Sequence, residues 1–186
     1  MLNKMTVTLG LGPRGIGIKT MMRLLAELAK NHGSQFADRG GIIDYHTTKR
    51  TEFGPQLKRH RNPDQIPSDL ILAATKFWMM ELQASSGAEH FFLAGFPVSV
   101  QEASLWKFTT PQVRVIALVP DGRHEIPELE PFNGHVLRLP RSMPIRSRLS
   151  TAINHINARQ ELTYRWQTHL NDHRHPVRKA IKELGN

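Results

Sequence analysis

The sequence predicts a doubly wound α/β domain, in which helices cover both faces of a five-stranded parallel sheet. Apolar segments of strand length alternate along the chain with segments of helical spacing, which is typical of this fold class. The later apolar runs are continuous, as expected for strands that are buried on both faces. With 186 residues, 39% hydrophobic and 22% charged, the chain suits one well-packed domain.

The chain begins with a predicted strand and a glycine-rich turn. Residues 5–9 (MTVTL) form the strand, and the turn occupies residues 10–17. Methionine and leucine residues at helical spacing predict a helix over 19–31, with Gly33 as its stop. A second short strand is predicted at 41–45 (GIIDY).

The middle of the chain contains a region without a clear period. Residues 46–67 are polar and basic, and prolines interrupt them. Ser68 is expected to cap a helix that continues to about residue 80. An apolar third strand is predicted at 90–94, and a helix at 99–108.

Two more strands are predicted in the last third. The continuous apolar run at 113–119 is the fourth strand, and the alternating run at 135–139 is the fifth. The acidic, proline-containing residues 120–133 between them are expected to form a loop. A long amphipathic helix over 145–170 and a short basic helix after Pro176 complete the expected order.

The composition limits the classes of function. The net charge of +9 and a pI near 10.4 favour a polyanionic partner, with ordinary solubility as the alternative. The chain has no cysteine, which excludes disulfides, thiolate metal sites and cysteine nucleophiles. No apolar run approaches the roughly 20 residues of a membrane span, and no signal peptide is recognised, although a removed presequence stays an open alternative. No metal site is predicted.

The glycine-rich turn lies between a strand and a helix, where backbone amides can bind a phosphate. The spacing of Gly12 and Gly17 satisfies the phosphate-loop pattern, but Ile18 occupies the position of its lysine. Lys19 comes one residue late, and a rotation of about 100° per helical residue should point it away from a bound phosphate. Either the turn is structural, or it retains some anion binding through Gly12, Gly15, Gly17, Lys19 and Thr20.

Four short segments resemble known sequence motifs, and they follow one another along the chain in the same order as those motifs. Residues 12–20 (GPRGIGIKT) resemble G-P-P-G-S-G-K-G-T, and residues 45–48 (YHTT) resemble a segment that ends in S-T-G-D. Residues 66–69 (IPSD) resemble L-V-P-D, and residues 92–99 (FLAGFPVS) resemble L-D-G-F-P-R-T. Together they resemble the adenylate kinases and related nucleoside monophosphate kinases, over about residues 5–165. The resemblance implies a phosphate-loop fold with a monophosphate-binding region at 46–67, where Thr47 and Thr48 would be remnants.

The chain departs from this family where the family carries its chemistry. Ile18 replaces the loop lysine, Ala94 an acidic residue near magnesium, and Val98 an arginine that binds the monophosphate. Glu102 stands near an expected glutamine and would face the substrate with negative charge. Lys49 and Arg50 replace the G-D pair. Because phosphoryl transfer depends on cations around the phosphates, these changes predict an inactive protein.

The family's mobile, arginine-bearing lid is also missing. Only residues 120–134 separate the fourth and fifth predicted strands, and their charge is mainly acidic. So short a segment cannot close over a site and exclude water. Arg146 and Arg148, at the start of the last long helix, are the cations that could compensate.

Exposed basic residues are expected to form a contact surface for phosphate backbones or an acidic partner. No RNA-binding signature occurs, and 7% aromatic content gives no base-stacking platform. The residues of this surface are Lys49, Arg50, Lys58, Arg59, Arg61, Arg138 and Arg141.

We therefore expect an adenylate-kinase-like domain over residues 1–170, with a degenerate monophosphate-binding region and a truncated lid region, followed by a basic tail at 171–186. The expected function is that of a catalytically inactive structural or assembly subunit of a larger protein or ribonucleoprotein complex, plausibly ribosomal or mitochondrial. The alternative is a divergent nucleoside monophosphate kinase or an ATP-binding sensor. No cofactor is required, although residual binding of ATP, ADP or Mg²⁺ is compatible with the loop. An intracellular location is expected, with the mitochondrion as one option within it, and the oligomeric state is open.

Overall fold

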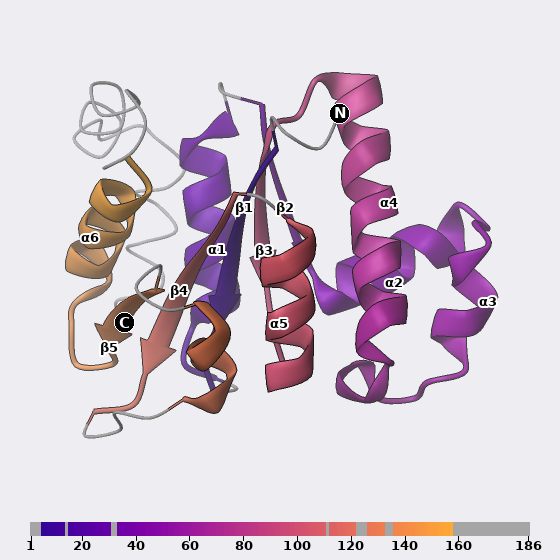
Figure 1. Cartoon of the computed structure of the whole chain (residues 1–186). Helices are drawn as coiled ribbons and strands as arrows, with labels where there is room; N and C mark the ends of the chain where they lie inside the picture. The colour runs from indigo at the N-terminus through magenta and orange to yellow at the C-terminus, as the bar shows by residue number, and fades with distance from the viewer. Residues whose placement is uncertain are drawn as a thin grey trace.

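The computed structural model describes residues 5–13, 15–30, 33–110, 112–121, 126–132 and 136–157. Its centre is a five-stranded, all-parallel sheet with the order β2-β3-β1-β4-β5 (Figure 1). This arrangement confirms the doubly wound α/β fold. The strands are β1 (Thr6–Leu11), β2 (Ser34–Asp38), β3 (His90–Ala94), β4 (Val113–Val119) and β5 (Val136–Pro140).

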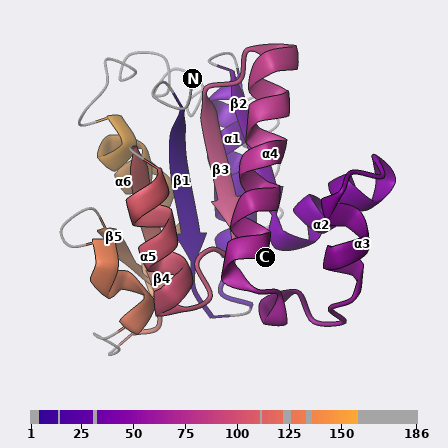
Figure 2. The ribbon, with the colours of Figure 1, turned by 45° about the vertical axis from the view of Figure 1, so that its right-hand side comes forward.

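Helices cover both faces of the sheet. The helices are α1 (Ile18–Leu28), α2 (Arg39–Thr48), α3 (Phe53–Lys58), α4 (Ser68–Ser86), α5 (Val100–Thr109) and α6 (Ile145–Asn157). Helices α1 and α6 lie on one face of the sheet, and α4 and α5 lie on the other (Figure 2). Side chains of α1 and α6 form one buried cluster against the sheet, and those of α4 and α5 contribute to a second cluster on the opposite face. The two clusters share no residue, because successive side chains of each strand point to opposite faces.

Strand β1 is the centre of the molecule. All six of its residues are buried, and it pairs with β3 on one side and β4 on the other. The chain connects β1 toward β2 on one side of the sheet, whereas it connects β3 across to β4 on the other. Connections that diverge in this way leave a crevice at the carboxyl ends of β1 and β3, where ligands bind in open α/β sheets.

The prediction of the second strand at 41–45 is wrong. The strand lies at Ser34–Asp38, and residues 41–45 belong to α2. Strand β2 is at the edge of the sheet, so it does not need a continuous apolar run. The Asp38 side chain accepts a hydrogen bond from the Gly41 amide (2.7 Å) and caps α2. Ile42 and His46 form the buried stripe of this helix.

Helices α2 and α3, with the turn after them, form an arm over residues 39–61 that projects on the side of β2, away from α6 (Figures 1 and 2). His46 is fully buried within the arm: its Nε2 donates to the Ala74 carbonyl (2.8 Å) and its Nδ1 lies 2.7 Å from the Thr51 hydroxyl. Phe53 and Phe77 pack against its ring. Burial lowers the pKa of His46, so the ring is neutral at neutral pH.

The other predicted elements agree with the structure within a few residues, with two exceptions. The expected loop at 120–133 contains a 3-10 helix, η4 (Pro127–Phe132), because Leu129 and Phe132 are buried in the core. Pro67, rather than Ser68, precedes the first residue of α4, so Ser68 does not cap it. The described part of the last helix ends at Asn157. The rest of the predicted helix and the basic tail at 171–186 lie outside the described residues.

No helix in the described ranges combines the length and apolar character that a membrane crossing requires.

The packing of α3 on α2 can be tested with two glycine substitutions. A Cβ added at Gly54 would lie 2.8 Å from the His46 carbonyl oxygen, whereas one at Gly40 would meet only Asp38 Oδ1 at 3.5 Å. We expect Gly54→Ala to lower the free energy of unfolding by about 1–3 kcal/mol. Gly40→Ala is the matched control and should change it by less than about 1 kcal/mol. Urea denaturation measures both, and equal stability of the two variants would contradict this packing.

Candidate functional site

The glycine-rich turn borders a cavity of about 930 Å³ at the carboxyl ends of β1 and β3. Gly15 and Gly17 have φ values of 79° and 93°, a left-handed conformation that favours glycine. Gly17 also caps α1 without any side-chain hydrogen bond, so the first amides of this helix have no capping side chain. The loop therefore keeps a shape that can accept an anion at a helix N-terminus.

The Lys19 side chain is engaged by another residue of the protein as well as lining this cavity. Its Nζ forms an ion pair with Asp38 Oδ2, which joins the first turn of α1 to the end of β2. Burial acts to raise the pKa of Asp38, but the hydrogen bonds from Lys19 and the Gly41 amide and the charges of Lys19 and Arg23 outweigh it, so the pKa lies below its usual value. Lys19 thus lies on the side of β2, beside the cavity, with its charge neutralised by a carboxylate.

Arg39, the first residue of α2, forms the second ion pair at this site. Its Nη1 donates to both carboxylate oxygens of Glu102 at 2.9 Å, and its Nε donates to the Pro63 carbonyl at 3.3 Å. The guanidinium lies 4.9 Å from the centre of the Phe96 ring. Only 5% of the Arg39 side chain and 0% of the Glu102 side chain are exposed, so the pair is buried.

Glu102 has a different environment from the one that the sequence predicts. The expectation that it faces the ligand is wrong, because it is buried against Arg39 and does not line the cavity. Burial raises its pKa, although the Arg39 charge and several hydrogen bonds act in the opposite direction. The Nη2 of Arg39, in contrast, is a buried donor that has no hydrogen-bond partner among the described residues. Arg39 also lines the cavity.

The balance of charge around the cavity is unfavourable for phosphoryl transfer. Its described lining has two cationic side chains, Lys19 and Arg39, and each is already paired with a carboxylate. Asp64 and Glu128 also line it. A substrate with several phosphate charges requires excess positive charge at this position.

One position that the resemblance implies near magnesium lacks its carboxylate. Thr20 lines the cavity and could offer its hydroxyl, but the end of β3 offers Ala94 instead of a carboxylate. Within the described ranges, no group of three or more His, Cys, Asp or Glu side chains could hold a metal ion.

The structure brings together most positions that the resemblance singles out. The cavity lining contains the loop residues and both altered positions after β3, namely Gly12, Gly15, Gly17, Ile18, Lys19, Thr20, Ala94 and Val98. Thr47 and Thr48 do not line it, since they lie at the end of α2. Arg146 and Arg148 do not line it either: Arg146 is exposed on α6, and the Arg148 Nε donates to the Met143 carbonyl (2.7 Å).

The predicted basic surface separates into two regions. One lies on the α2–α3 arm, where all five basic side chains are exposed: Lys49, Arg50, Lys58, Arg59 and Arg61. The other lies at β5 and the turn after it, where Arg138 and Arg141 are exposed. These regions come from opposite edges of the sheet, since β2 and β5 are its two edge strands.

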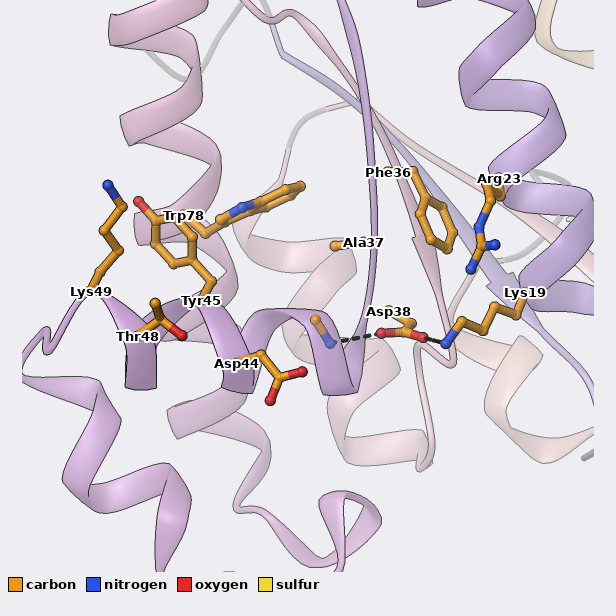
Figure 3. Close-up of a pocket in the computed structure, with 11 residues that line it drawn as sticks. Lys19, Arg23, Phe36, Ala37, Asp38, Asp44, Tyr45, Thr48, Lys49 and Trp78 are labelled. Atoms are coloured by element: carbon orange, nitrogen blue, oxygen red, sulfur yellow. Dashed lines mark hydrogen bonds and ion pairs between the residues drawn. The ribbon is translucent and has the colours of Figure 1, made fainter. Parts of the chain in front are cut away.

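A second pocket, of about 430 Å³, lies at the free edge of β2 (Figure 3). Tyr45 and Trp78 lie on one side of the strand, and Phe36 and Arg23 on the other. The Arg23 guanidinium lies 5.5 Å from the centre of the Phe36 ring. The remaining lining side chains include Lys19, Asp38, Asp44, Thr48 and Lys49.

Sequence reasoning missed Arg39, Asp38 and this second pocket. The misplaced second strand hid the first two, because it moved the end of the strand away from Asp38. An Asp before a segment of helical spacing is an N-cap signal that could have located the start of α2. The pocket combines residues of α1, β2, α2 and α4, so no local sequence pattern indicates it.

No protein-family model matches the chain, and no curated protein matches its sequence. The structure shows the α/β fold with its five-stranded parallel sheet.

The buried pair can be tested by a double-mutant cycle. Glu102→Leu leaves the Arg39 charge buried without its partner, and we expect it to lower the free energy of unfolding by about 3–5 kcal/mol. The double variant Arg39→Met/Glu102→Leu removes both charges and should regain most of this loss. Urea denaturation of the four proteins gives the coupling free energy. Additive effects of the two substitutions would show that the side chains do not depend on each other.

The Asp38 ion pair predicts a pH dependence of stability. A carboxyl with a lowered pKa in the folded state stabilises the protein above its unfolded pKa of about 3.9, and this contribution is lost as the pH falls through the folded pKa. Between pH 5 and pH 3, Asp38→Asn should therefore lose less stability than the unaltered chain. Asparagine can still cap α2. Asp44→Asn is the control, and thermal melts at each pH should show the unaltered slope for it.

Proposed function

We propose that the protein is a catalytically inactive, adenylate-kinase-like subunit with a structural or assembly role in a larger complex. The observation that carries this proposal is the neutralised charge of the loop cavity. Lys19 and Arg39, the cationic side chains of its described lining, are both engaged by carboxylates that belong to the protein. A fold that uses these cations for its own ion pairs has few left for the phosphates of a substrate.

The chemistry of phosphoryl transfer supports the same proposal. The reaction requires cations that stabilise charge on the transferred group, and a single such arginine can contribute a factor of about 10³–10⁵ to the rate. At the loop, the position of the lysine is occupied by Ile18, which is buried among apolar side chains of α1 and β4. After β3, Ala94 and Val98 offer neither a carboxylate nor a guanidinium to the cavity.

The surface charge supports a partner rather than a small substrate. The net charge of +9 and the exposed cations of the α2–α3 arm favour a polyanionic assembly, such as a ribonucleoprotein particle. An intracellular assembly, ribosomal or mitochondrial, fits this chemistry.

A second candidate function is a nucleotide sensor that binds without turnover. The observation that favours it is the open cavity beside the loop, together with the unpartnered Nη2 of the buried Arg39. An anion that reached this donor would satisfy it. The sensor differs from the structural subunit in its affinity for nucleotides, and both differ from a kinase in turnover.

Turnover and binding can be measured on the isolated chain. We expect no transfer of phosphate from ATP to AMP above the rate without protein, because the cavity lacks the required cations. Calorimetry with ATP, ADP and AMP in the presence of Mg²⁺ should detect no binding up to millimolar nucleotide.

Thr20→Val is the matched variant for these measurements, since it removes the loop hydroxyl with little change of volume. Robust phosphoryl transfer that this variant abolishes would refute the proposal. Submicromolar binding without turnover would replace the structural subunit with the sensor.

A further inference from the structure

The α2–α3 arm carries a concentration of positive charge that the fold does not use. Residues 49–61 contain five cationic side chains and one carboxylate, Glu52. All five cations are exposed, and in the described part of the chain none of their side chains makes an ion pair or a hydrogen bond. Lys19 and Arg39 at the loop cavity are both paired with carboxylates, so unpaired exposed cations distinguish the arm from the cavity.

The cations are held on a firmly packed support. Leu57 and His46 are both fully buried, and the Thr51 amide donates to the His46 carbonyl at 3.1 Å. The turn between the helices places Arg50 in the left-handed conformation, with φ 54°. This packing fixes the backbone from which the cations extend, so less conformational entropy is lost when they contact a ligand.

The pocket at the free edge of β2 adjoins this charged arm. Lys49 belongs to both, because it is one of the arm's cations and also lines the pocket (Figure 3). Three aromatic residues line the pocket: the half-buried Tyr45 and the buried Trp78 on one side of β2, and Phe36 on the other. Tyr45 is therefore the ring that a base can reach beside Lys49. The fold thus brings together aromatic residues that are far apart in the sequence.

The polar groups of the pocket suit the edge of a nucleobase. Asp44 lines the pocket and could accept hydrogen bonds from a base amino or imino group, as carboxylates do in base recognition. Thr48 offers a hydroxyl that can donate or accept. Arg23, which lies over the Phe36 ring, offers a further flat surface for stacking.

We propose that the α2–α3 arm and the pocket at the free edge of β2 form one binding surface for single-stranded nucleic acid. Lys49, Arg50 and the cations at the end of α3 contact the phosphate backbone, and one unstacked base stacks on Tyr45 at the pocket. A duplex is a poor ligand, because its bases are paired and stacked and cannot enter the pocket. An acidic protein would match the cations equally well but has no flat base to stack on Tyr45.

This inference goes beyond the structural role proposed above and does not depend on the loop cavity. Phosphoryl transfer and nucleotide calorimetry test the cavity, whereas oligonucleotide binding tests the arm and the pocket, so the two can fail separately.

The first experiment measures binding of the full chain to labelled 12-nucleotide RNA and DNA single strands by fluorescence anisotropy. With three to five phosphate contacts, the slope of log K against log salt should be about −2 to −3.5. A hairpin duplex of equal charge should bind at least about tenfold more weakly. Equal affinity for the duplex, or no binding of any oligonucleotide at low salt, would overturn the proposal. Stronger competition by a polyglutamate peptide than by single strands would point to an acidic protein instead and would also overturn it.

Matched variants separate a local surface from the net charge. Lys58→Gln/Arg59→Gln/Arg61→Gln should weaken binding by about tenfold or more and reduce the salt slope by about 2. Lys30→Gln/Lys107→Gln/Arg146→Gln removes the same charge from exposed positions outside the arm and should change affinity by less than about threefold. Equal losses in both triple variants would show that only the net charge matters, against the proposal.

The pocket has its own test. Tyr45→Ala should weaken binding of single strands by about tenfold through loss of stacking, and Tyr45→Phe, which keeps the ring, should bind like the unaltered chain. If Tyr45→Ala lowers the melting temperature, photocrosslinking of 4-thiouridine RNA to the unaltered chain replaces it. Crosslinks at residues 36–49 or 78 support the proposal, whereas crosslinks confined to other regions overturn it. Excess ATP should not displace the RNA, and displacement would assign the binding to the loop cavity.

Discussion

The buried contact between Arg39 and Glu102 is the constraint that organises the carboxyl ends of the strands. Removing two charges from water costs several kcal/mol for each ion, so such a pair persists only where its geometry is good. Here one nitrogen of Arg39 contacts both oxygens of Glu102 at 2.9 Å. The same guanidinium reaches the Pro63 carbonyl and the Phe96 ring. One side chain therefore connects α2 to α5, to the segment before α4 and to the end of β3.

The neighbouring residue extends this constraint to the glycine-rich turn. Asp38 caps α2 and forms an ion pair with Lys19 on α1. Asp38, the last residue of β2, and Arg39, the first residue of α2, thus fix α2 and restrain α1. Each of their ion pairs engages a cation that lines the loop cavity. The loop can keep its shape because its glycines and its position between β1 and α1 determine that shape. Its electrostatic character is that of a neutralised site, because the nearby cations are paired with carboxylates of the protein.

The order of helices and strands could be read from the sequence wherever the apolar pattern was strong. Strands such as 90–94 and 113–119 are buried on both faces, so their continuous runs are distinctive. The edge strand β2 has only two buried residues, Ser34 and Ala37, so nothing marked it as a strand. The GIIDY segment was misleading because a short, weakly amphipathic helix and a short strand share such a pattern.

The candidate sites could be predicted from the sequence where their residues are close together along the chain, and not where they come from distant segments. The glycine-rich turn is a continuous motif, and the structure brings its residues to one cavity. The partners of Lys19 and Arg39 come from distant segments, at positions 38 and 102. Sequence reasoning predicted that the Glu102 side chain faces the ligand. That prediction failed because a sequence motif aligns positions but does not give the direction of a side chain. The pocket at β2 required the same long-range information.

The distribution of charge follows from these contacts. Cations beside the cavity are neutralised, whereas those on the arm repel one another across a surface that carries one carboxylate between residues 49 and 61. Such repulsion destabilises a compact state. The buried His46, with the half-buried Phe53 of the arm and Phe77 of α4 packed around it, must therefore hold the arm in place against it. A polyanion bound along the arm would relieve this repulsion, so binding and stability of the arm are thermodynamically linked. The same cations would be costly for an isolated domain and less so beside a bound polyanion, so the proposed partner is better sought at the arm than at the loop.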